Sequence, residues 1–76
     1  MTLSTFNKIK PYISSIEMCA TVTQEYGHCR GIINELELIR KEFKPDAPPV
    51  DKGCGNCILE MIKDIYRHYK LYEREI

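Results

Sequence analysis

The sequence predicts a small all-α protein with two to three helices. Apolar residues recur every three or four positions along most of the chain, which is the period of a helix with one buried face. β-Branched and aromatic residues never alternate with polar ones for more than a few positions, so no strand is predicted. We expect residues 1–76 to form a single domain. A chain of 76 residues buries only about 60% of its unfolded surface, so its core is marginal and often needs support from disulfides, a metal or another chain.

The first helical segment is predicted from Ile9 onwards. Its apolar positions follow the i, i+3, i+4, i+7 spacing of a buried helical face: Ile9, Tyr12, Ile13, Ile16, Cys19 and Ala20. Pro11 is tolerated in a first turn, because the N–H that it lacks has no helical partner there. We expect the preceding residues, 2–10, to form a flexible arm and a second contact with a partner.

A second helical segment follows, with its buried face displaced by about one residue relative to the first. Its apolar positions are Tyr26, Cys29, Ile32, Ile33, Leu36, Ile39 and Phe43. The displacement falls near Gly27, where glycines and β-branched residues weaken helix propensity. The region 9–43 is therefore predicted to be either two helices or one bent helix, and to be most regular over 29–43.

Residues 44–56 are predicted to be a Pro/Gly-rich connector. Three prolines, at positions 45, 48 and 49, fix φ and remove backbone donors, so no helix passes through. The most regular apolar stripe of the chain comes next: Ile58, Met61, Ile62, Ile65, Tyr69, Tyr72 and Ile76. A continuous helix over this range would be about 30 Å long. We expect it to fold back on the middle helix as an antiparallel hairpin.

The charge and hydropathy of the chain exclude several function classes. Eleven basic and eleven acidic residues cancel, which disfavours binding to nucleic acid through its phosphates. The apolar runs are too short for a membrane span, and the N-terminus lacks the apolar segment of a signal peptide. We therefore expect a cytoplasmic protein that does not bind membranes and whose cysteines are reduced.

The motif Cys54-Gly-Asn-Cys57 has four interpretations. In a redox site, the helix N-terminus stabilises a thiolate, but that chemistry usually belongs to a βαβ setting, which this chain lacks. In a zinc site, the two thiols form one half, and Cys29 with Cys19 or His28 would complete it. In a disulfide, Cys54 and Cys57 bond to each other or one of them bonds to Cys29.

The interpretation that we favour is core packing, because a free cysteine behaves as a small and readily buried hydrophobe. Cys19 and Cys29 lie in phase with the apolar faces of their helices, and Cys57 begins the stripe of the last one. No metal or cofactor is then needed. Zinc remains the alternative.

The sequence does not predict an enzyme. It contains no Gly-rich phosphate loop and no HExxH motif, and its histidines and carboxylates suggest no acid–base pair. Asp64 is spaced to reach Arg67 or His68, which we interpret as a surface pair. Tyrosine and arginine are enriched where proteins meet. We therefore predict that a surface of the last helix contacts a protein partner or a second copy of the chain, with the anchors Tyr66, Arg67, Tyr69 and Tyr72.

The segment "CGNCILEMIKDIYRHY" resembles short CxxC-containing proteins of unknown role that are encoded among the structural genes of tailed bacteriophages. The resemblance covers about the last third of the chain. It implies a small virion or assembly component used in many copies, and a place in the virion. The prediction is thus a non-enzymatic structural or interaction protein; the alternatives are a zinc-stabilised adaptor or regulatory protein and a thiol redox protein.

Overall fold

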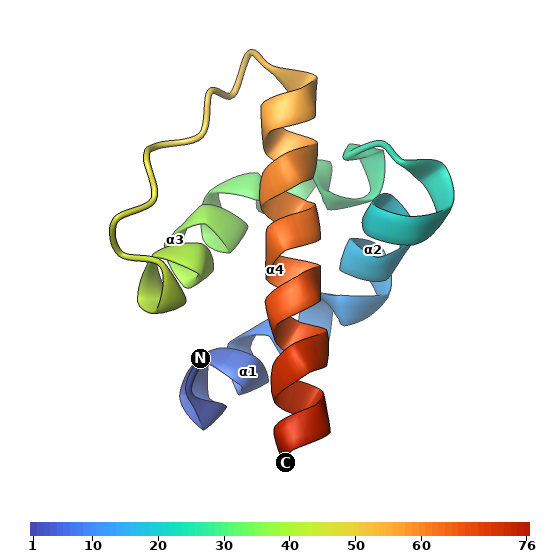
Figure 1. Cartoon of the computed structure of the whole chain (residues 1–76). Helices are drawn as coiled ribbons and strands as arrows, with labels where there is room; N and C mark the ends of the chain where they lie inside the picture. The colour runs from blue at the N-terminus through green and yellow to red at the C-terminus, as the bar shows by residue number, and fades with distance from the viewer.

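The computed structural model describes residues 1–76 and consists of helices and loops without any strand (Figure 1). In chain order the elements are α1 (Leu3–Ile9), the 3₁₀ turn η1 (Lys10–Tyr12), α2 (Ile13–Glu17), the π-helical segment η2 (Met18–Thr23), the 3₁₀ segment η3 (Gly27–Ile32), α3 (Ile33–Phe43) and α4 (Gly55–Glu75). The all-α prediction is confirmed, and the connector is non-helical as predicted, although it ends at residue 54 because α4 begins at Gly55. No helix combines the length and the apolar character that a bilayer crossing requires.

The N-terminal residues form a helix instead of the expected flexible arm. The side chain of Thr2 caps α1 by accepting a hydrogen bond from the backbone N–H of Thr5, at 3.2 Å. Phe6 and Ile9 are buried. Phe6 extends the apolar spacing that begins at Ile9 by one more turn, and burial of this face holds α1 on the rest of the molecule.

The predicted irregularity near Gly27 proves to be a complete break between two helical segments. The first segment ends at Gln24, whose backbone is left-handed with φ of 56°. That conformation costs about 1–2 kcal/mol for a residue with a Cβ. The Gln24 side chain donates a hydrogen bond to the carbonyl of Ala20 at 3.1 Å, which offsets part of this cost. The second segment, η3 followed by α3, begins at Gly27.

α4 is the central element of the fold and runs almost the full length of the molecule (Figure 1). The core combines residues from every helical region except η1: Phe6, Ile9, Ile16, Cys19, Cys29, Leu36, Ile39, Ile58, Met61, Ile62, Ile65 and Tyr69. Five of them come from α4, so its predicted apolar stripe is confirmed from Ile58 to Tyr69. Beyond this point Tyr72 is only half-buried and Ile76 is 69% exposed.

The relative direction of α3 and α4 differs from the predicted antiparallel hairpin. Tyr26, just before η3, lies against Gly55 at the start of α4, and Phe43, at the end of α3, packs its ring 4.8 Å from that of His68. Contacts therefore advance in the same direction along both segments. The antiparallel neighbours of α4 are the N-terminal segments, since Phe6 of α1 stacks on Tyr69 near its C-terminal end.

The extended connector explains this arrangement. Residues 44–54 can reach about 35 Å when extended, about twice the length of α3. The connector thus has room to return alongside α3 before α4 begins (Figure 1). The carboxylate of Glu37 in α3 holds it there by accepting hydrogen bonds from the backbone N–H of Val50 at 2.7 Å and from Nζ of Lys52 at 2.6 Å.

Candidate functional site

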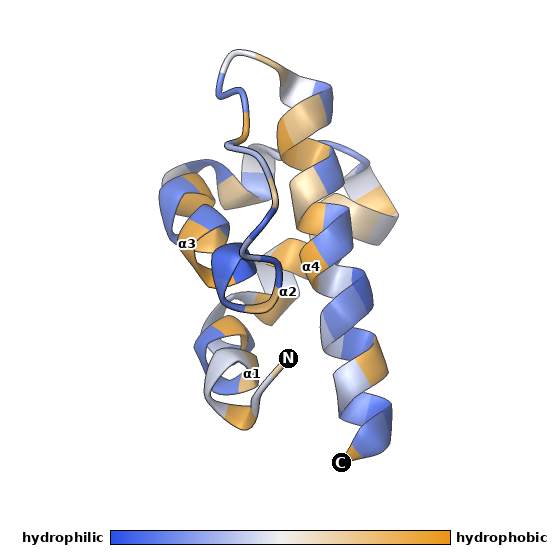
Figure 2. Ribbon diagram, turned by 60° about the vertical axis from the view of Figure 1, so that its left-hand side comes forward, coloured by the Kyte–Doolittle hydropathy of each residue, from blue (hydrophilic) through white to orange (hydrophobic).

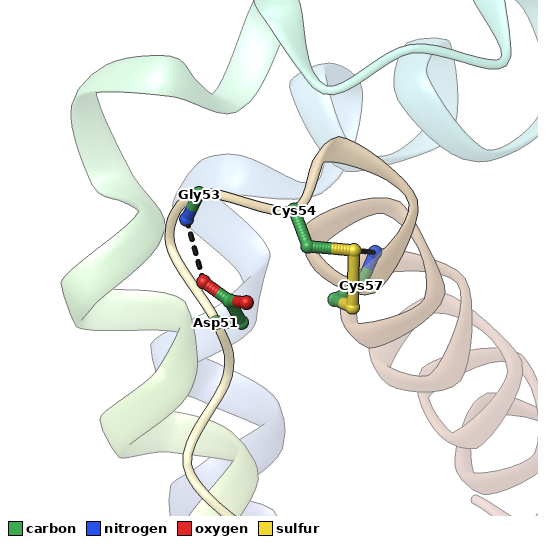
Figure 3. The surroundings of a disulfide bond; sticks show 4 residues. All are labelled: Asp51, Gly53, Cys54 and Cys57. Carbon is green, nitrogen blue, oxygen red and sulfur yellow. Dashed lines mark hydrogen bonds between the residues drawn. A yellow bond between two sulfur atoms is a disulfide. The ribbon is translucent and has the colours of Figure 1, made fainter.

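Cys54 and Cys57 are joined by a disulfide at the start of α4 (Figure 3). Cys54 is the N-cap residue, and its Sγ accepts a hydrogen bond from the backbone N–H of Cys57 at 3.2 Å. The carboxylate of Asp51 accepts the N–H of Gly53 at 2.9 Å and closes the preceding turn. The two Cα atoms are 5.2 Å apart, which lies within the usual range for a disulfide.

The exposure of this pair corrects the core-packing prediction for Cys57. Cys57 is exposed and Cys54 is half-buried, whereas the next residue, Ile58, is 1% exposed. Each step of one residue turns the side chain by about 100° around a helix, so Cys57 falls outside the buried face. The local bridge is the interpretation that the geometry supports for these two cysteines, and it leaves their sulfur atoms within reach of dissolved thiols.

Cys19 and Cys29 form a second pair, and both lie fully buried in the core as predicted. Their sulfur atoms are 3.5 Å apart, at hydrogen-bonding distance for two thiols. Burial, helped by the hydrogen bond and the charge of Cys19, raises the pKa of Cys29 to about 12. Cys29 is therefore a protonated thiol at neutral pH.

The structure does not bring together the residues of the alternative zinc site. Cys54 and Cys57 bond to each other, Cys19 and Cys29 pair in the core, and His28 points to solvent as an exposed residue. No group of three or more His, Cys, Asp and Glu side chains is placed to hold a metal ion. The geometry thus gives the zinc interpretation no support.

Asp64 lies at the centre of a buried ionic network, where a surface pair was expected. Only 5% of Asp64 is exposed, and its carboxylate accepts hydrogen bonds from Lys44 at 2.8 Å and Arg67 at 2.6 Å. Arg40 approaches to 3.5 Å. Burial by itself would raise the pKa of Asp64, but the hydrogen bonds and charges of its partners outweigh burial and lower it. The network joins the end of α3 to the middle of α4.

A hollow of about 390 Å³ adjoins both the network and the disulfide. The connector and α4 form most of its wall, which includes Cys57. Its charged lining consists of three cations and three carboxylates: Arg40, Lys44, Arg67, Asp51, Glu60 and Asp64. The charges balance, so the hollow has no electrostatic preference for an anion or a cation.

The predicted partner-binding residues divide between the core and the surface. Tyr69 is 4% exposed and stacks on Phe6 with ring centroids 4.4 Å apart, and Tyr72 packs against the same ring at 5.2 Å. Both tyrosines hold α1, and the buried Tyr69 has no surface free for a partner. Tyr66 is half-buried and Arg67 is exposed. A spacing of three residues rotates the side chain by about 60° at each step, so the row crosses the buried face, with Tyr69 in the core and Tyr66 and Tyr72 at its two edges.

Tyr66 and Arg67 belong to a different surface, which we name the outer face of α4. It comprises Tyr66, Arg67, Lys70, Leu71 and Arg74, which together line a shallow hollow of about 420 Å³. Leu71 is 49% exposed. Lys70, Leu71 and Arg74 were not predicted from the sequence, although their spacings of three, four and seven residues from Arg67 place them on one side of a helix.

Comparisons with protein-family models, with curated proteins and with solved structures gave no match.

Proposed function

We propose that this protein is a non-enzymatic interaction protein that binds a protein partner through the outer face of α4. The observation that carries the proposal is the half-exposed Leu71, set among three cations and a tyrosine on the last turns of the longest helix. Aromatic residues and arginine are enriched in protein interfaces, and an apolar anchor with a charged rim is a common form of contact.

The position of this face supports the proposal. The C-terminal part of α4 lies at one end of the molecule, with α1 beside it and α3 far from its last turn (Figure 1). Figure 2 shows that this part of the helix is largely hydrophilic, with few apolar positions. A helix with one covered side and one exposed, amphipathic side can dock in a groove of a partner.

The charges indicate what kind of partner would fit. Lys70 donates a hydrogen bond to Glu73 at 2.9 Å, and Arg67 is bound to Asp64, but Arg74 makes no ion pair. A second copy of the chain, related by a two-fold axis, would set these cations against one another. We therefore propose a different protein, with acidic residues around an apolar pocket for Leu71. A small virion or assembly component, as the phage resemblance implies, would make such contacts repeatedly.

The size of the native complex tests this proposal. We expect the chain to elute from a size-exclusion column, in extracts of the cells where it is made, far above its own mass of 8.9 kDa. Leu71→Glu should return it to the monomer position, because the variant places a carboxylate in the apolar pocket and beside the acidic residues around it. The matched control is Leu38→Glu on α3, where the leucine is 64% exposed on another side of the molecule. Loss of the complex in the Leu38 variant alone, or in neither variant, would contradict the proposal.

A thiol redox protein is the second candidate, and the exposed disulfide is the observation that favours it. On reduction, the N–H of Cys57 and the positive end of the helix would stabilise a thiolate at Cys54, which makes Cys54 the better leaving group in exchange. A glutathione titration that reads the oxidation state of each cysteine would measure this activity. A midpoint within the range of glutathione buffers is the result that the redox candidate requires.

A further inference from the structure

Cys19 and Cys29 occupy an unusual position for two thiols that are only ten residues apart in the chain. They come from different elements, η2 and η3, and both are 0% exposed. Their sulfur atoms are 3.5 Å apart, whereas a disulfide bond is about 2.05 Å long. Closing the pair requires an approach of about 1.5 Å, which small rotations of the side chains and a slight backbone shift can supply.

The backbone around the pair is the least regular of the helical parts of the molecule. η2 is π-helical and η3 is a 3₁₀ segment, and both forms have poorer hydrogen-bond geometry than an α-helix. Between them Gln24 adopts the left-handed conformation. Apart from the adjacent backbone, no heavy atom lies within 4 Å of the place that a Cβ would occupy on Gly27 or Gly31, so there is free space beside the backbone of η3.

We infer that Cys19 and Cys29 are a second redox modification site, at which a small-molecule disulfide such as oxidised glutathione forms an intramolecular Cys19–Cys29 bond. One cysteine thiolate attacks the small disulfide, forming a mixed disulfide and releasing one small thiolate. The other cysteine then attacks the protein sulfur of the mixed disulfide and releases the second small thiolate. Two protein thiols are oxidised, one small disulfide is reduced to two thiols, and the two protons pass to the solvent and the leaving thiolates.

Oxidation of Cys19 and Cys29 is slow because both thiols are fully buried. Burial keeps Cys29 protonated, and a protonated thiol is not a nucleophile. Attack therefore follows local opening of residues 18–32. The bond would then close a ring around the Gln24 turn and restrict the unfolded chain, so the oxidised form should melt at a temperature higher by at least about 5 °C. The site does not depend on exchange at Cys54 and Cys57.

The test uses the full chain with Cys54→Ala and Cys57→Ala, so that only the buried pair can react. The reduced protein is equilibrated with increasing ratios of oxidised to reduced glutathione, quenched in acid and alkylated. We expect a product lighter than the reduced chain by two hydrogens. Cleavage after Glu25, which lies between the cysteines, should yield two peptides joined only by the disulfide. A further Cys19→Ala change is the control, and it must abolish this product.

Equilibrium is approached from both directions, so that slow opening cannot hide the result. One sample starts as the reduced folded chain, and the other is oxidised in denaturant and then refolded. Both should converge on the intramolecular bond, and the oxidised form should melt at the higher temperature. The inference is overturned if both samples end as thiols or as single glutathione adducts at the most oxidising ratio. It is also overturned if the oxidised form melts below the reduced one.

Discussion

At the scale of single residues, the buried carboxylate of Asp64 ties α4 to the end of α3, with Lys44 at 2.8 Å and Arg40 at 3.5 Å. The sequence placed Asp64 within reach of Arg67, and that ion pair is present at 2.6 Å. It did not predict that Asp64 would be buried, because Lys44 and Arg40 arrive from α3 through tertiary packing that no local spacing reveals. Likewise, the burial of Cys29 in η3 was predicted from its place in the apolar pattern. The exposure of Cys57 was not predicted, because it depends on which side of α4 faces the core in the first turn of the helix.

Removal of the Asp64 carboxylate should destabilise the fold. Asp64→Asn keeps the shape but leaves three cations around a neutral amide, so we expect the free energy of unfolding to fall by about 1–3 kcal/mol. Chemical denaturation measures this loss. The matched control is Glu73→Gln, which breaks an exposed ion pair with Lys70 and should cost less than about 0.5 kcal/mol.

The same variant has a distinct pH dependence. The folded pKa of Asp64 is lowered, so its contribution to stability is present above its unfolded pKa of about 3.9 and is lost as the pH falls through the folded value. The difference in stability between the wild type and Asp64→Asn should therefore shrink below about pH 4. The carboxylates of Glu37 and Glu42, whose pKa values are also lowered, are unchanged in the variant and cancel in the comparison. A difference that stays constant from pH 7 to pH 2 would contradict the network.

At the scale of the elements, periodicity predicted α4 well and predicted the ends of the chain poorly. The stripe from Ile58 to Tyr69 is long and regular, and one buried face explains it. α1 was missed although two signals were available: Thr2 as a capping residue, and Phe6 three residues before Ile9. The direction of α3 was also missed, because a connector longer than its helix permits either orientation, and the Glu37 contacts that select one are tertiary.

The docking of α1 should depend on Phe6. Its ring is 2% exposed and lies between Tyr69 and Tyr72, so Phe6→Ala should lower the free energy of unfolding by about 3–5 kcal/mol. Hydrogen exchange should also increase in α1 and in the last turns of α4. Leu3→Ala in the same helix is the control, since Leu3 is 55% exposed and the change should cost under about 1 kcal/mol. Equal effects of the two substitutions would show that α1 is not held by this contact.

At the scale of the whole molecule, the all-α class followed from periodicity because α1, α2, η2 and α3 each pack against α4. The surface that remains is what bears on function, and periodicity identifies covered faces much better than contact faces. It led to Tyr69 and Tyr72, which cover Phe6, and overlooked Leu71 and Arg74 on the outer face of α4. A single exposed leucine does not form a periodic pattern. The outer face of α4 could therefore be identified only once the structure showed which face of the helix is buried.

The central claim, that the outer face of α4 contacts a protein partner, is tested most directly by site-specific photo-crosslinking in the cells where the chain is made. A photoreactive amino acid replaces Leu71 in one variant and Leu38 in the other, two exposed leucines on different sides of the molecule. We expect a discrete crosslinked product from position 71, a partner with acidic residues beside the crosslinked site, and no such product from position 38. A product from position 38 alone, or from neither position, would contradict it.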